Sequence, residues 1–287
     1  MRKSLFIIAV LLVLGFQKQE TGNDYSTNEV LKYLQANTDE GYCIMKAFLE
    51  KKIDKNRKIN GEKYTNSEYL ELFLKNAEST LDSISGVGTL IHETIHGMNK
   101  QDFFYYNYFI NCNRTIKVKH TSTFKSRKLV EIIPDSCKTI RFDLYIDVKG
   151  NYVTQHYGIY GLLDEFLAYY KGVKAEYDFK STINDSIYFA GIVTSEMQAY
   201  YEFKYYIISY LIYAEDNHSR KFNRIMNNNE FKEVFEYVDK NFSILVNKFI
   251  DDGGTISWKD KDNYHFIIKT LQTSQYQEMY HRILLNE

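Results

Sequence analysis

The stretch that decides the fold is Gly86-Val-Gly-Thr-Leu-Ile-His-Glu-Thr-Ile-His-Gly-Met98. Its apolar residues recur every three to four positions, which predicts an amphipathic helix. The segment Gly86-Val-Gly88 is expected to break the helical pattern before it, and Gly97 is typical of a helix end. The stretch therefore predicts one helix with two histidines a turn apart.

Inside this stretch, His92-Glu-Thr-Ile-His96 has the pattern HExxH. Residues four apart lie on one face of a helix, so both imidazoles can hold one Zn²⁺. Glu93 lies beside them, where its carboxylate can reach a metal-bound water without binding the metal. The spacing predicts a zinc site with His92 and His96 as ligands and Glu93 as the catalytic base. The alternative interpretation is a pair of surface histidines on an amphipathic helix.

A zinc site of this kind needs a third protein ligand and an open position. Glu165 fits best, because it lies in the strongly apolar helical segment 161–170, where an unpartnered carboxylate would be costly to bury. Glu196 follows a similar pattern in more polar surroundings. Asp102 lies six residues after His96, the ligand position of a metzincin-like site. Glu165 is the predicted ligand, and the other two remain alternatives.

Outward from this segment, the periodicity predicts an α+β fold that is mostly helical with a small antiparallel sheet. Segments that alternate with period two are expected to form strands. They are 103–110, 115–119, 129–133 and 140–148. Helices are expected at 28–49, 67–84, 159–172, 188–215, 229–249 and 262–284.

The N-terminus has the pattern of a signal peptide, predicted here as residues 1–15. Arg2 and Lys3 precede an apolar run, Leu5 to Leu14, that is short for a membrane span. Residues 16–28 are polar and are expected to form a flexible lead-in, followed by a single domain over 29–287. The mature protein is thus expected to be secreted or periplasmic, without stable membrane insertion; an uncleaved N-terminal anchor is the alternative.

Composition narrows the classes of function. The 287 residues are 44% hydrophobic and 25% charged, as in ordinary globular proteins. The formal net charge is −1, or −3 without Arg2 and Lys3, so no basic excess exists to bind nucleic acid. Of the three cysteines, Cys112 and Cys137 flank predicted strands and could pair in an exported protein. The alternative is three buried thiols.

On these motifs the chain resembles the HExxH zinc metallopeptidases, most closely the gluzincin group. The resemblance covers two short helical segments, the motif itself and the segment around Glu165. It implies zincin-like active-site helices, Zn²⁺ bound by His92, His96 and Glu165, and a peptide or protein substrate. In the hydrolysis that it implies, Glu93 moves a proton from water to the leaving amine.

The chain departs from the gluzincin pattern in two ways. Many gluzincins have an aspartate four residues after the ligand glutamate, and Tyr169 occupies that position here. The strand signals also follow the HExxH segment, whereas a substrate-binding sheet edge usually precedes it. A non-catalytic binding protein on the same scaffold is the competing function, as is a metzincin-like peptidase with Asp102 as third ligand.

Overall fold

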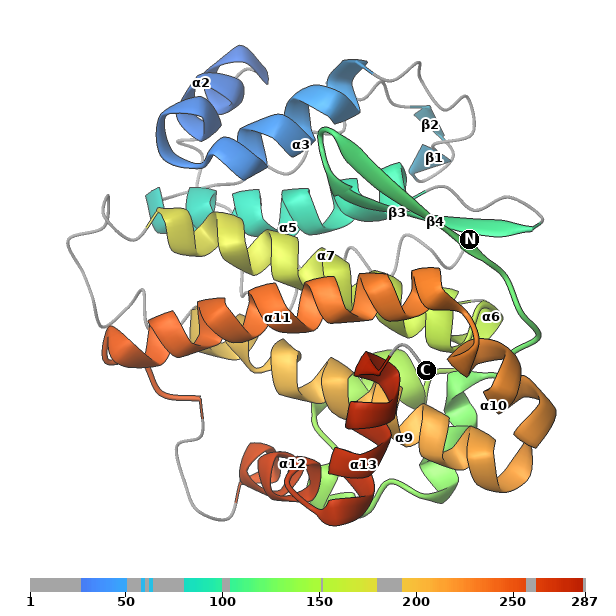
Figure 1. Cartoon of the computed structure of the whole chain (residues 1–287). Coiled ribbons are helices and arrows are strands. Elements are labelled where there is room, and N and C mark those ends of the chain that lie inside the picture. The colour runs from blue at the N-terminus through green and yellow to red at the C-terminus, as the bar shows by residue number, and fades with distance from the viewer. Residues whose placement is uncertain are drawn as a thin grey trace.

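The computed structural model describes residues 27–50, 58–59, 62–63, 80–99, 104–150, 152–179, 193–256 and 262–285. Its elements are mostly helices with two small antiparallel sheets, which confirms the predicted α+β class (Figure 1). The predicted signal peptide, residues 1–15, lies outside the described residues. No helix within the described part is both long and apolar enough to cross a bilayer.

Among its described residues, the N-terminal half contains three long helices and four strands. The helices are α2 (Thr27–Asn37), α3 (Asp39–Glu50) and α5 (Thr80–Met98). The strands are β1 (Lys58–Ile59), β2 (Glu62–Lys63), β3 (Tyr105–Asn111) and β4 (Arg114–Lys119). Strands β3 and β4 form an antiparallel hairpin in which Tyr105 is opposite Lys119, as the alternating pattern predicts.

The elements of the C-terminal half are helices, joined by short turns, in its described residues. Its elements are α6 (Val153–His156), α7 (Ile159–Asp178), α9 (Ala199–Asn217), α10 (Ser219–Met226), α11 (Asn229–Asp251), α12 (Asn263–Leu271) and α13 (Ser274–Leu284). The helical stretch expected at 28–49 and the helix expected at 262–284 each consist of two helices. The helix expected over 67–84 falls largely outside the described residues.

Helix α7 is the centre of the molecule. Nearly all of its side chains are buried, and it packs against α5, α9 and α11 (Figure 1). It begins after Gly158, whose φ of 56° is a left-handed conformation that favours glycine. A side chain there would also collide with the backbone of Phe124. The chain therefore turns tightly into α7, which lies among α5, α9 and α11.

Helices α5 and α7 run in opposite directions and approach closely at two glycines. A Cβ atom at Gly172 would lie 2.7 Å from the carbonyl oxygen of Gly88. The predicted helix break at Gly86-Val-Gly88 is wrong, because α5 continues through it from Thr80. Gly88 allows α7 to pack closely against α5 and does not end a helix. The side chain of Glu176 occupies the space where a Cβ at Gly88 would lie.

The strands predicted at 129–133 and 140–148 are also wrong. The first overlaps a 3₁₀ helix at Ser126–Glu131, and the second overlaps a π-helical turn at Phe142–Ile146. Side chains from α6 hold these turns. Gln155 donates to the carbonyls of Tyr145 and Ile146, at 3.1 and 3.2 Å. The carbonyls that a strand partner would use are thus satisfied by an amide side chain.

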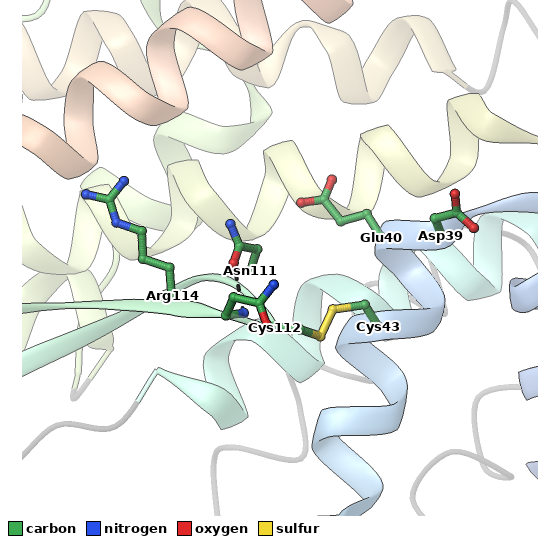
Figure 2. A pocket seen from close by; sticks show the side chains of 7 residues that line it. Asp39, Glu40, Cys43, Asn111, Cys112 and Arg114 are labelled. Atoms are coloured by element: carbon green, nitrogen blue, oxygen red, sulfur yellow. Dashed lines mark hydrogen bonds between the residues drawn. A yellow bond between two sulfur atoms is a disulfide. The ribbon is translucent and has the colours of Figure 1, made fainter.

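One disulfide joins Cys43 of α3 to Cys112 in the β3–β4 turn, with Cα atoms 6.1 Å apart (Figure 2). The pairing of Cys112 with Cys137 considered from the sequence is wrong. Cys137 is a buried free thiol whose Sγ lies 3.8 Å from Thr270 Oγ1 of α12. The β3–β4 turn lies beside α3, which brings Cys112 to Cys43. The positions of the cysteines next to predicted strands did not indicate this contact.

Candidate metal centre

The two motif histidines and Glu165 meet where α5 faces α7. His92 Nε2 and His96 Nε2 are 3.0 Å apart. Glu165 Oε2 lies 3.5 Å from the first of these atoms and 3.3 Å from the second. Within the described part of the chain, these three residues form the one group of three or more side chains arranged to hold a metal ion.

The three atoms fit a tetrahedral zinc ion. With Zn–N and Zn–O distances of about 2.0–2.1 Å, tetrahedral ligand atoms lie about 3.3–3.4 Å apart. The separations between His92, His96 and Glu165 are close to this value on all three edges. Glu165 Oε2 is also buried without a hydrogen-bond partner. A cation between the three atoms would satisfy this oxygen.

Asp164 orients one of the two histidines. His96 Nδ1 donates to Asp164 Oδ2 at 2.8 Å. Since the proton is on Nδ1 in the neutral ring, Nε2 has a free lone pair directed toward His92 and Glu165. Asp164 is 1% exposed, so its carboxylate interacts with protein groups and not with solvent.

The electrostatics of the site favour positive charge. Burial would lower the pKa of His96, but the carboxylates of Glu165 and Asp164 outweigh burial and raise it well above its usual value. Burial would likewise raise the pKa of Glu165, but His96 and His92 lower it to about 2. The buried carboxylates therefore attract either a proton on an imidazole or a metal cation bound to it.

Tyr169 contacts a ligand without acting as the aspartate it replaces in the gluzincin pattern. Its ring packs edge-on against His92, with ring centroids 4.6 Å apart. Its hydroxyl instead lies 3.0 Å from the hydroxyl of Tyr145. The guanidinium of Arg141 lies over this ring, 4.8 Å from the centroid. Tyr169 thus supports His92 by packing.

Glu93 lies on α5 between the two ligands in sequence and is half-buried. At about 100° per residue, it lies roughly 60° around the helix from His96. Among the described residues, it forms no hydrogen bond or ion pair that would engage its carboxylate. It lies within about 100° of both histidines around the helix, and its role as catalytic base stays a prediction.

Glu196 and Asp102 are the alternative third ligands considered from the sequence. Glu196 lies away from the histidines, with Oε2 3.2 Å from Nη2 of Arg141. That ion pair accounts for its carboxylate. Asp102 lies outside the described residues.

A surface pocket at the disulfide is separate from this centre (Figure 2). It is lined by Asp39, Glu40, Cys43, Asn111, Cys112, Asn113 and Arg114. Glu40 pairs with Lys171 of α7 beside it. None of the predicted catalytic or metal-binding residues lines this pocket.

Asp164 and Asn99 are the residues of the site that sequence reasoning missed. Asn99 donates from Nδ2 to Asp164 Oδ1. One signal for Asp164 was available, because a second carboxylate directly precedes Glu165 in an apolar segment. No local signal identifies Asn99, whose contact with Asp164 spans 65 residues.

Comparison with protein-family models, curated proteins and solved structures finds no match to this chain. The chemistry of the site therefore rests on its own residues.

Proposed function

We propose that this protein is an exported zinc-dependent metallopeptidase. The observation that carries the proposal is the convergence of His92 Nε2, His96 Nε2 and Glu165 Oε2 at 3.0–3.5 Å, with one buried oxygen left without a hydrogen bond. Two imidazoles and one carboxylate are a common ligand set of catalytic zinc sites, which leave a fourth position for water or substrate.

Zinc bound there would supply Lewis acidity, which polarises a carbonyl and makes water acidic. The chain's own residues would do the rest. Asp164 holds His96 in the tautomer that presents Nε2, and Tyr169 packs against His92. Glu93 accepts a proton from the attacking water at its carboxylate and returns it to the leaving nitrogen of a peptide bond.

Export is supported by two independent features. Residues 1–15 have the basic and apolar regions of a signal peptide. The disulfide between Cys43 and Cys112 is of a kind that persists in oxidising compartments. Both features support the proposed secreted or periplasmic location.

The test compares wild type with Glu93→Gln, after loading with zinc, on a mixture of unstructured peptides. Because Glu93 moves protons and does not bind metal, the variant is expected to retain about one zinc per chain and to lose turnover by roughly 10²-fold or more. Cleavage is followed by mass spectrometry. Zinc-loaded wild type that cleaves no peptide would favour a binding protein on this scaffold, and equal activity of the two proteins would exclude Glu93 as the base.

A further inference from the structure

We propose that Asn99 is a positioning residue, which fixes the carboxylate of Asp164 and through it the metal ligand His96. The inference rests on the metal-binding part of the proposed function and is independent of whether the substrate is a peptide. Asn99 contacts neither the predicted metal position nor the reacting atoms.

A continuous chain of three hydrogen bonds links the backbone of strand β3 to His96. The N–H of Phe109 donates to Asn99 Oδ1 at 2.7 Å. Asn99 Nδ2 donates to Asp164 Oδ1. Asp164 Oδ2 then accepts from His96 Nδ1 at 2.8 Å. These hydrogen bonds connect the residue directly after α5, the second turn of α7 and a strand of the hairpin.

The chemistry of these partners requires an amide at position 99. A backbone N–H can only donate, and an ionised carboxylate can only accept. The side chain between Phe109 and Asp164 must therefore accept at one atom and donate at the other, as an asparagine does in a single orientation. An aspartate has no donor when ionised, and a leucine has neither group.

Burial of Asn99 and Asp164 increases the effect of losing the hydrogen bond between them. Asn99 is 4% exposed and Asp164 is 1% exposed, so water does not replace a lost partner easily. With both oxygens of Asp164 engaged, its carboxylate plane is held against rotation. The imidazole of His96 is in turn held with Nε2 toward the other two ligands. Loss of Asn99 would free Asp164 to rotate and His96 to follow it.

Asn228 provides a matched control. It is also buried, and it also bridges segments. Its Nδ2 donates to the carbonyl of Lys119 at 2.9 Å and to the hydroxyl of Tyr160 at 3.5 Å, and its Oδ1 accepts from the N–H of Phe231 at 3.1 Å. Its bonds reach the end of β4, the start of α11 and Tyr160 in the first turn of α7, and none of them reaches Asp164 or His96. Replacing it removes a similar pair of bonds without touching the metal centre.

The experiment measures zinc affinity by competition with a chromogenic chelator, and the visible spectrum of the Co²⁺-substituted protein, which reports ligand geometry. The proteins are wild type, Asn99→Leu, Asn99→Ser and Asn228→Ala. The serine variant, too short to bridge both partners, replaces the leucine variant if that one fails to fold. Partners of metal-bound histidines contribute roughly 10- to 100-fold to metal affinity, so both Asn99 variants are expected to bind zinc about 10-fold or more weakly.

The spectrum of the Asn99 variants is expected to change, and Asn228→Ala is expected to lose stability while keeping wild-type affinity and spectrum. Asn99 variants with wild-type affinity and spectrum would overturn the inference, as would an equal loss of affinity in Asn228→Ala. A wild type that binds no zinc would instead overturn the proposed metal site itself. Metal binding without peptide cleavage would leave the role of Asn99 intact.

Discussion

Replacing Gly172 with alanine would separate the two helices that form the metal centre. The added Cβ would lie 2.7 Å from the carbonyl oxygen of Gly88 and 3.3 Å from Cβ of His92. To bring the distance between this Cβ and the Gly88 oxygen to an ordinary contact near 3.4 Å, α7 must move away from α5 by about 0.7 Å. Metal–ligand distances tolerate only about ±0.2 Å. A displacement of this size would therefore pull Glu165 out of reach of a metal bound by the two histidines.

Two opposing energies decide the stability of the variant. Overpacking costs roughly 1–3 kcal/mol, whereas alanine favours a helix over glycine by about 1 kcal/mol. The metal-free variant is therefore expected to be less stable by about 0–2 kcal/mol. Each tenfold loss of zinc affinity would remove about 1.4 kcal/mol from the stabilisation by excess zinc.

The assay is urea unfolding of wild type and Gly172→Ala, each without metal and with excess zinc. Zinc is expected to stabilise the variant clearly less than it stabilises wild type. A variant that is more stable than wild type without metal, and equally stabilised by zinc, would refute the close helix contact as the basis of the site.

Two other features give further predictions. Glu176 is buried with one oxygen unpartnered, and burial raises its pKa well above the usual value. The folded protein therefore holds this proton to higher pH than the unfolded chain, and the stability that it contributes is lost as pH rises. Glu176→Gln should thus match wild type in urea at pH 4 and exceed it by roughly 1–3 kcal/mol at pH 8; a pH-independent difference would contradict this. The disulfide closes a separation of 69 residues, so the double variant Cys43→Ala and Cys112→Ala should lose up to about 4 kcal/mol in guanidinium unfolding. Cys137→Ala, which leaves the bond intact, should lose clearly less.

The features that sequence predicts well are those that a single helix encodes. The spacing of His92 and His96 places both imidazoles on one helix face whatever surrounds that helix. Glu165 was identified because a carboxylate in an apolar helix needs a partner. Both predictions depend on local geometry and on the cost of burial, and the structure brings these residues together.

The features that sequence missed depend on which elements become neighbours. Gly88 resembles a helix breaker, yet it lies inside α5 because Gly172 and Glu176 of α7 approach it closely. The alternation over 140–148 resembles a strand, yet Gln155 of α6 satisfies the carbonyls of a π-helical turn there. The role of Asn99 was missed for the same reason, because its two hydrogen-bond partners, Asp164 and Phe109, come from separate elements.

The zinc content of the purified chain tests the central claim most directly. Elemental analysis would compare wild type with Glu165→Gln, which keeps the shape of the side chain but weakens it as a ligand. Glu196→Gln is the matched control, since that carboxylate pairs with Arg141 and lies outside the centre. We expect about one zinc per chain in wild type and in Glu196→Gln, and clearly less in Glu165→Gln. A wild type that takes up no zinc, or a Glu165→Gln variant that retains it fully, would contradict the metal centre described here.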